Sequence, residues 1–380
     1  MKIAILTYQF NLGGAGIAAE QQYYAFKSAG YDVYKIDLSE KLRAHRDFSR
    51  RLSVKLGNLV GRWLSGEIFS FDYFAKSQNL AFLNEYDVLI IHWPHFATLN
   101  FDDLVHITSR KIFVAHDMFF CNFFAHYVSF DNLPSIGIKR LLCKFLERVL
   151  RRRRKRVYSY FDLVVSPSEW LCGELGSAGL PIPAVQIDNF FNQSNDIIDM
   201  SLQARCDIYK IAFGAATLQK NSRKGLDLFL EVLQVLREKL SNHEVLIFGA
   251  GEISEAIKQN QNIHFTGELS QKEVREALHD CDLYVHTARM DNAPNIIIES
   301  LMVGTPVCAF AVGGVTELIE NNSDGVLIEP YEISEMAKVI SELASDKLKL
   351  QSKTEILQNA VKKFSSEPAL EKWKMILSYE

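Results

Sequence analysis

Short apolar runs rich in β-branched residues alternate with helix-length segments along the whole chain. In the first half these runs occupy residues 2–8, 32–37, 87–93, 111–116, 162–167 and 184–189. The pattern begins again in the second half, with runs at residues 209–215, 243–250, 262–267, 282–287, 306–311 and 325–330. Continuous apolarity is typical of strands that are buried on both faces of a parallel sheet. The pattern therefore predicts an α/β fold with two Rossmann-like parallel-sheet domains.

A polar segment separates the two sets of predicted strands. Residues 192–207 are rich in Asn, Asp, Ser and Gln, a composition typical of a linker. We therefore expect an N-terminal domain over residues 1–200 and a C-terminal domain over residues 201–365. Residues 366–380 predict an amphipathic helix that docks on an apolar surface. Its apolar side chains, at helical spacing, are Leu370, Trp373, Ile376 and Leu377.

Size and charge exclude several classes of protein. The 380 residues exceed the size at which single cores usually stop growing, about 250 residues, so two domains are expected. The 42 basic and 46 acidic residues give a net charge of -4, which argues against nucleic-acid binding. The first apolar run is too short for a signal peptide, and no run approaches the roughly 20 residues of a membrane span. We expect a cytoplasmic protein.

The sequence gives little support for a metal site. Its six cysteines never stand in the closely spaced pairs that zinc sites and redox motifs use. Asp280 and Asp282 form an acid-x-acid triplet of the kind that can hold a divalent cation. This triplet joins a predicted helix to a predicted strand, without another cluster of oxygen ligands. We therefore expect no metal and no bound cofactor.

A glycine-rich turn follows the first predicted strand. Gly14, Ala15 and Gly16 stand at a predicted helix start, where exposed amides bind phosphate or another anion. Gly14, Gly16 and Ala19 also fit the alanine variant of the dinucleotide-binding fingerprint, and Asp37 stands about where a ribose-binding acid would. Two alternatives are therefore a nicotinamide-dependent oxidoreductase and a turn that serves packing alone.

A histidine and an aspartate stand at the carboxyl end of the strand predicted over residues 111–116. Open α/β sheets bind their ligands at this end, so His116 and Asp117 are candidate site residues. The imidazole could donate to a sugar hydroxyl or transfer a proton, and the neighbouring acid could fix its tautomer. The alternative is a histidine satisfied within its own loop, although the nearby His126 and Tyr127 favour a site.

Basic residues follow the first strand of the second predicted domain. Lys220, Arg223 and Lys224 immediately precede a predicted amphipathic helix. Cations at a strand end suit a diphosphate, because arginine forks onto two oxygens and lysine acts as a point charge. Basic residues on loops are usually only solvated, which is the alternative interpretation.

Residues 291–299, DNAPNIIIE, place two carboxylates eight positions apart across a loop that leads into an apolar helix start. Carboxylates accept hydrogen bonds from vicinal hydroxyls, so Asp291 and Glu299 are candidates to hold a sugar and a ribose. Helix-start groups between them would stabilise a diphosphate. The candidates in this segment are Asn292, Pro294, Asn295 and Ile296. Alternatively, Asp291 is a turn residue and Glu299 a helix-terminal charge.

Residues 139–156 hold ten basic residues against one glutamate. Four apolar residues share one helical face: Leu142, Phe145, Leu146 and Val149. A basic amphipathic helix can lie on an anionic membrane surface or bind a charged acceptor. The alternative is a solvated face, the more common role of a charge run. The concentration of cations in a chain of net negative charge makes this segment a candidate membrane contact.

Together, these segments resemble family 4 glycosyltransferases of the GT-B fold, in the form common among bacterial polysaccharide-building enzymes. The resemblance rests on residues 291–319, with GGAGIAA, AHDMFF, AHY, SPSEWL and RKGLDLFLEVL in the family's order. It implies two Rossmann-like domains facing across a cleft, with a C-terminal helix that crosses back. It also implies metal-independent, retaining transfer of a hexose-type sugar from a nucleotide diphosphate sugar. The acceptor would be a glycan or lipid-linked molecule in polysaccharide or lipopolysaccharide biosynthesis.

Position by position, the resemblance implies that Glu299 binds the ribose, Asp291 a hydroxyl of the donor sugar and Lys224 the diphosphate. His116 would face the sugar. The loop at Gly14 to Gly16 would approach the phosphate or the acceptor, on the N-terminal side of the cleft.

Some positions depart from the family pattern. The family often has an arginine five residues before the lysine; this chain has Gln219, so Arg223 or Lys220 would have to substitute. The HDM segment usually continues through Thr-Gly-Gly-Cys, which residues 122–125 replace with Asn-Phe-Phe-Ala. A third alternative is therefore a catalytically silent homologue that acts as a binding partner.

Overall fold

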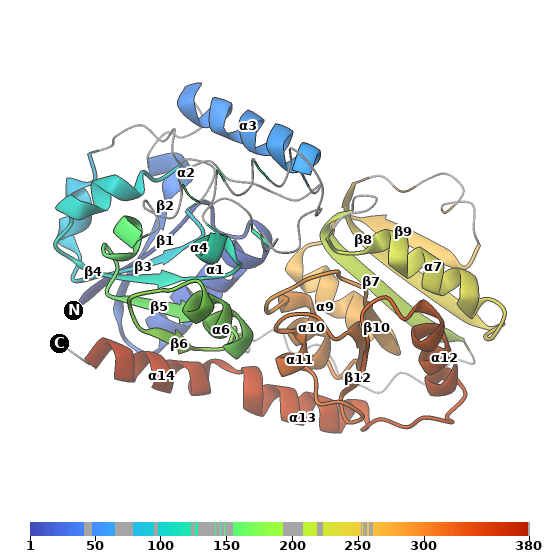
Figure 1. Ribbon diagram of the computed structural model, residues 1–380. Coiled ribbons are helices and arrows are strands. Elements are labelled where there is room, and N and C mark those ends of the chain that lie inside the picture. The colour runs from blue at the N-terminus through green and yellow to red at the C-terminus, as the bar shows by residue number, and fades with distance from the viewer. Residues whose placement is uncertain are drawn as a thin grey trace. The chain divides into compact units, whose positions relative to one another are not determined.

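The computed structural model describes residues 1–41, 48–64, 79–94, 98–122, 126–127, 141, 145, 148, 155–192, 208–218, 223–251, 253, 257 and 261–378. The chain forms two compact units, Met1–Phe190 with Leu370–Glu380, and Phe191–Ala369. Each unit is built on a six-stranded parallel sheet with helices packed against it (Figure 1). The predicted linker lies outside the described residues, apart from its first residue.

The sheet of the first unit has the strand order β2-β1-β3-β4-β5-β6. Its strands are β1 (Lys2–Thr7), β2 (Asp32–Asp37), β3 (Val88–His92), β4 (Arg110–Val114), β5 (Leu163–Ser166) and β6 (Ala184–Gln186). Its described helices, with η for 3-10 helices, are α1 (Gly13–Ser28), α2 (Leu38–Lys41), α3 (Phe48–Leu64), η3 (Ala81–Glu85), η4 (Phe101–His106), α4 (Phe119–Asn122) and α6 (Glu169–Ser177). Every residue of β3 and β5 is buried, which explains why these strands are nearly continuous apolar runs.

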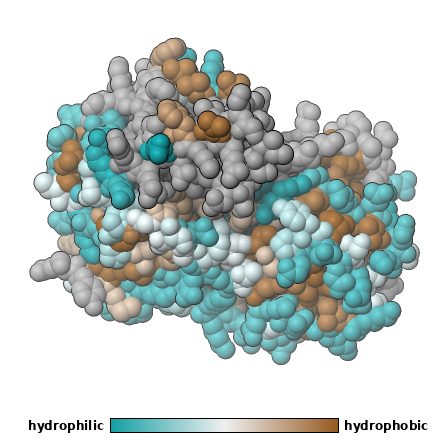
Figure 2. All heavy atoms as spheres, viewed as in Figure 1, coloured by the Kyte–Doolittle hydropathy of each residue, from teal (hydrophilic) through white to brown (hydrophobic). Residues whose placement is uncertain are grey.

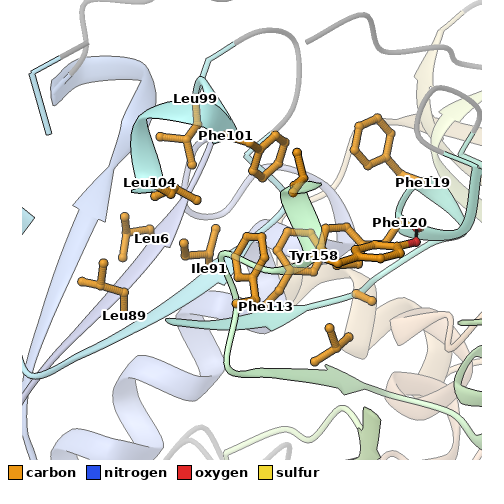
Figure 3. Packing of buried hydrophobic residues seen from close by; sticks show 14 of the residues in the cluster. Leu6, Leu89, Ile91, Leu99, Phe101, Leu104, Phe113, Phe119, Phe120 and Tyr158 are labelled. Carbon is orange, nitrogen blue, oxygen red and sulfur yellow. Dashed lines mark hydrogen bonds between the residues drawn. The ribbon is translucent and has the colours of Figure 1, made fainter. Parts of the chain in front are cut away.

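The core on one face of this sheet is rich in aromatic rings. Phe113 of β4 stacks on Phe120 with 4.1 Å between ring centroids, and the Tyr158 hydroxyl donates to the Phe120 carbonyl oxygen. Figure 3 shows Phe120 against Phe113 and Tyr158, with Phe119 beside them. Phe119 and Phe120 begin α4, directly after the segment that contains His116. Their burial therefore anchors that segment.

The C-terminal helix α14 (Ser366–Ser378) returns to the first unit. Trp373 packs edge-on against Phe26 of α1, with 5.7 Å between ring centroids. Arg110 donates a hydrogen bond of 2.8 Å from Nη1 to the carbonyl oxygen of Ile376. The predicted amphipathic helix thus docks on the first unit through its apolar side.

The sheet of the second unit has the strand order β12-β11-β10-β7-β8-β9. Its strands are β7 (Tyr209–Leu218), β8 (His243–Gly251), β9 (Ile263–Gly267), β10 (Leu283–His286), β11 (Val307–Phe310) and β12 (Gly325–Ile328). Its described helices are α7 (Leu226–Leu236), α9 (Gln271–His279), α10 (Asn295–Leu301), α11 (Val315–Leu318), α12 (Ile333–Ala344) and α13 (Lys353–Phe364). The predicted α/β class with two parallel sheets is confirmed. β7 extends beyond its predicted end because it continues past an irregularity between Gly214 and Thr217.

Candidate active site

The strand order of the second unit reverses direction between β7 and β10. The chain builds β7, β8 and β9 toward one edge and then returns to place β10 on the other side of β7. Loops leaving the two strands at such a reversal diverge, and the crevice at their carboxyl ends is the usual ligand site of an open α/β sheet. Arg223 and Lys224 follow β7, whereas Asp291 follows β10. The predicted basic loop and acidic loop are therefore neighbours.

Backbone contacts hold these two loops together. Gly225 has a φ of 71°, and a Cβ at this position would lie 1.9 Å from the carbonyl oxygen of Thr287. The Thr287 hydroxyl donates to the Gly225 carbonyl oxygen at 2.8 Å, and the Arg289 amide donates to the Arg223 carbonyl oxygen at 2.8 Å. Arg289 also binds both oxygens of Asp227, at 2.9 and 2.6 Å. The loop after β7 therefore has one fixed position against the loop after β10.

We expect Gly225→Ala to lower the unfolding free energy of the second unit by more than the strain of its backbone conformation alone would. Gly267 is the matched control, because it has a similar φ of 75° but no atom within 4 Å of an added Cβ. Gly267→Ala should cost about 1 kcal/mol of unfolding free energy, and Gly225→Ala about 2 kcal/mol more from the clash. Urea unfolding of both variants measures this difference. Equal losses would show that the loops move apart without cost.

Asp291 binds both cations of the loop after β7. Lys224 Nζ lies 2.6 Å from Oδ2 of Asp291, and Arg223 Nη1 lies 2.9 Å from Oδ1. The aspartate is only 3% exposed. Burial alone would raise its pKa, but Arg223, Lys224 and the neighbouring His286 hold the pKa of this carboxyl well below its ordinary value. Two cations and one carboxylate leave a net positive charge, which attracts an anion.

His286, the last residue of β10, borders this charged cluster and was absent from the predicted site. Its Nε2 lies 3.4 Å from Asp291 Oδ2 without a hydrogen bond of good geometry, and its Nδ1 lies 3.4 Å from the Tyr284 hydroxyl. Burial lowers the pKa of His286, and Lys224 and Arg223 lower it further against the opposing effect of Asp291. Its position at a predicted strand end, the criterion that identified His116, was the available signal.

Glu299 lies in α10 and is 6% exposed. No donor among the residues that the structure describes forms a hydrogen bond with its carboxylate. Burial raises the pKa of Glu299 to about 8, and the charge of Arg275 opposes this rise. A buried carboxyl group without donors is unfavourable, and a ligand that supplies hydroxyl donors would satisfy it. Its burial excludes the alternative of a solvated helix-terminal charge.

The loop between the two carboxylates leads into the first turn of α10. Pro294 is the N-cap residue of this helix, Asn295 and Ile296 form its first two positions, and Asn292 is buried just before it. Amides at a helix start favour a negative charge. The structure therefore places these four predicted residues between Asp291 and the first turn of α10.

In the first unit, His116 lies two residues after the end of β4 and pairs with a second histidine. His116 Nε2 lies 2.8 Å from Nδ1 of His92, and His92 Nε2 lies 2.6 Å from Oε1 of Gln22 in α1. Burial and the neighbouring His116 hold the pKa of His92 well below its ordinary value. Gln22, His92 and His116 therefore form a row of linked side chains, in which a neutral His92 fixes the orientation of the His116 ring. His92 ends β3 and was not among the predicted site residues.

Asp117 ties the loop after β4 together. Its Oδ2 accepts hydrogen bonds from His126 Nδ1 at 2.6 Å and Trp93 Nε1 at 3.2 Å, and its Oδ1 accepts from the Phe119 amide at 2.9 Å. The carboxylate is 7% exposed. The imidazole partner that orients His116 is His92, whereas the sequence suggested Asp117 for that role.

The glycine-rich turn lies at the start of α1. Gly14, Ala15 and Gly16 belong to the first turn of this helix, which begins at Gly13. A Cβ on Gly16 would lie 2.5 Å from the carbonyl oxygen of Gln9, so close packing by itself requires this glycine. The packing alternative thus accounts for Gly16, whereas an anion contact through the amides of Gly14 and Ala15 stays a prediction.

Among the described residues, no group of three or more His, Cys, Asp or Glu side chains is arranged to hold a metal ion. Asp282 of the acid-x-acid triplet accepts a hydrogen bond of 2.8 Å from the Lys210 amide.

Within the residues that the structure describes, no helix has the length and apolarity needed to cross a bilayer. Gln219, Lys220 and most of residues 139–156 lie outside the described residues.

Comparisons with known proteins agree with this geometry. Residues 210–363 match the family model of group 1 glycosyl transferases. The poly(ribitol-phosphate) alpha-N-acetylglucosaminyltransferase of Staphylococcus aureus is 26% identical over 196 residues, which are 49% of this chain and 39% of that protein. The amylovoran biosynthesis glycosyltransferase AmsK of Erwinia amylovora is 24% identical over 32% of this chain and 33% of its own length. The chain thus spans less than half the length of these curated relatives.

The structure of Anabaena Alr3699/HepE in complex with UDP-glucose matches the whole of both chains, with a TM-score of 0.68 and 16% identity. With its two parallel sheets and returning C-terminal helix, the chain has the GT-B fold. The segment that matches this family model contains Arg223, Lys224, Asp291 and Glu299.

Proposed function

We propose that this protein transfers a hexose-type sugar from a nucleotide diphosphate sugar to a glycan or lipid-linked acceptor, with retention of configuration, as family 4 enzymes do. The observation that carries the proposal is the cation pair Arg223 and Lys224, held by Asp291 at the strand reversal that also presents the buried Glu299. This arrangement provides positive charge for a diphosphate and a buried acceptor for ribose hydroxyls.

The chemistry follows from charge placement. When the sugar leaves its nucleotide, negative charge develops on the diphosphate oxygens, and preorganised cations stabilise that charge most. Arg223 and Lys224 supply this stabilisation, together with the amides at the start of α10. The departing diphosphate can itself take the acceptor proton, so the proposal needs neither a metal cofactor nor a dedicated protein base. His116, oriented by His92, is the proposed sugar contact of the first unit.

The relatives indicate which substrates to test first. Solved structures of HepE contain UDP or UDP-glucose, which makes a UDP-sugar the first donor to try. Two curated relatives act on poly(ribitol phosphate) or in amylovoran biosynthesis, and they support an acceptor in cell-surface polysaccharide or lipopolysaccharide assembly. Contact of residues 139–156 with an anionic membrane and a cytoplasmic location stay predictions.

The nicotinamide-dependent alternative relies on Asp37 for the ribose, but one oxygen of this carboxylate is already engaged within its own loop. Oδ1 of Asp37 accepts hydrogen bonds from the Ser39 amide at 2.9 Å, the Ser39 hydroxyl at 2.6 Å and the Glu40 amide at 3.2 Å. Asp37 therefore caps α2. No observation specifically favours a catalytically silent binding protein.

Lys224→Met tests the proposed donor site. We expect the Kd for UDP to rise at least about tenfold, because a charge-assisted hydrogen bond to the diphosphate is lost. The Kd for uridine should stay unchanged, since uridine has no phosphate. Isothermal titration measures both constants, and Lys272→Met at a 65% exposed position is the control. Stabilisation of the wild-type protein by NADH but by no sugar nucleotide would overturn the proposed function.

A further inference from the structure

Helix α3 turns large apolar side chains toward solvent. Phe48 is 72% exposed, Leu59 is 66% exposed and Leu52 is 37% exposed. Ser53 and Gly57, by contrast, are buried. An ordinary surface helix buries its apolar side and exposes its small and polar residues. Over its described side chains, α3 instead buries two small residues and exposes three large apolar ones.

The exposed residues form one continuous stripe. Positions 48, 52, 55 and 59 follow one another at intervals of four, three and four residues, so they stack along a single side of the helix. Ser53 and Gly57 are four residues apart and lie on the opposite side. Figure 2 shows hydrophobic residues gathered where Figure 1 places α3. The outward stripe is therefore shared by several side chains between residues 48 and 59 and is not the result of one misplaced side chain.

The charge of α3 is of one sign. The segment FSRRLSVKLGNLVGRWL contains four basic residues and no acidic one. They are Arg50, Arg51, Lys55 and Arg62. Lys55 lies within the apolar stripe and Arg51 beside it, and both are exposed. The whole chain carries a net charge of -4, so this cationic helix differs from the average surface.

We propose that α3 is a membrane-docking helix, which lies flat on an anionic lipid bilayer with Phe48, Leu52 and Leu59 inserted among the acyl chains. Apolar side chains flanked by cations on one helical face are the chemistry that binds such a surface. A second copy of the chain is a poorer occupant, because pairing two α3 stripes would bring like charges together. At 17 residues, α3 lies on the bilayer rather than crossing it.

This inference does not rest on the proposed transferase activity, because the observations on α3 involve none of the candidate site residues. It also differs from the predicted contact through residues 139–156. That segment was identified from its cations and the helical spacing of its apolar residues in the sequence, whereas α3 was identified by the direction its apolar residues face in the structure. The two segments can therefore be tested separately in the full-length chain.

Co-sedimentation with lipid vesicles tests the inference. Vesicles of phosphatidylcholine with about one third phosphatidylglycerol should retain the wild-type chain, whereas pure phosphatidylcholine should retain much less. The double variant Phe48→Ser/Leu59→Ser should lower partitioning at least about tenfold, and Arg51→Gln and Lys55→Gln about fivefold each. Val105→Ser and Lys272→Gln, at positions 57% and 65% exposed on other elements, are matched controls that should bind like wild type. Because all these residues are exposed, the variants should fold.

Three results would overturn the inference. If the wild-type chain does not bind anionic vesicles, a lipid bilayer is not the partner of α3. Retention that persists in Phe48→Ser/Leu59→Ser but is lost when Arg152 and Arg153 are changed to Gln assigns the contact to residues 139–156. A wild-type dimer that dissociates in Phe48→Ser/Leu59→Ser, without vesicle binding, makes the stripe an interface between copies. In each case Lys224→Met still reports independently on the donor site.

Discussion

Asp291→Ala should lower the free energy of unfolding by about 3 kcal/mol, more than any surface substitution, because it leaves two partly buried cations without their carboxylate. Arg223 and Lys224 have side chains only 19% and 26% exposed, so water replaces the lost partner poorly. The depressed pKa of Asp291 shows the same coupling from the other side. Sugar transfer should fall at least about a hundredfold, since the cations would lose the geometry in which they meet the diphosphate.

Chemical unfolding of the second unit, with and without UDP, measures the stability effect. Glu335→Gln is the matched control, because Glu335 forms an exposed ion pair with Lys338 in the same unit and should contribute less than about 1 kcal/mol. Asp291→Glu should restore part of the stability, since it keeps the charge. If Asp291→Ala unfolds like the control while transfer is lost, the carboxylate acts by contacting the sugar, as the family resemblance implies, and not by holding the cations.

The strands could be predicted from sequence because burial on both faces leaves a simple record. β3 and β11 are buried at every position, and such a strand must be apolar throughout. The orientation of helix α3 could not be predicted, because the sequence pattern does not show that its apolar residues face solvent. The side of α3 that faces the protein is the one that carries Ser53 and Gly57, and their burial is a property of the tertiary structure.

The candidate site was predicted in part. Strand-end position identified His116, Arg223 and Lys224, because parallel strands bring their carboxyl ends to one edge of a sheet. Asp291 and Lys224 are 67 positions apart along the chain, and neither sequence segment indicates that its residue contacts the other. The resemblance assigned them separate ligands, whereas the structure makes them partners. His92 was overlooked because it ends an apolar run that the strand pattern already explained.

Glu299→Gln should abolish the pH dependence of nucleoside binding, and Glu299→Ala should reduce turnover at least about a hundredfold. In the unliganded protein, burial raises the pKa of Glu299 to about 8 from an ordinary value of 4.5. The protonated form therefore predominates at pH 7. Ribose hydroxyls donate hydrogen bonds to the ionised form, so binding lowers this pKa and releases a proton.

The direction of the pH dependence of uridine binding follows from this proton release. Because the bound state holds fewer protons, the affinity of wild-type protein for uridine should rise with pH below about 8, by up to about tenfold per pH unit, and then level off. The stability of the unliganded protein should change in the opposite sense. The contribution of the protonated group is complete below pH 4.5 and is lost as the pH rises through about 8.

Titration calorimetry at several pH values, in buffers with different ionisation enthalpies, counts the released protons directly. Glu299→Gln retains the shape of the side chain but cannot ionise, so its uridine affinity should be flat across the same range. Glu273→Gln is a suitable control, since Glu273 caps α9 at the surface and its pKa is lowered by its hydrogen bonds with Ser270. A flat wild-type profile, or a slope that survives in Glu299→Gln, would place the ribose elsewhere. The buried Glu299 carboxyl would then have to be explained by packing alone, although a buried acid without donors is costly to keep for that purpose.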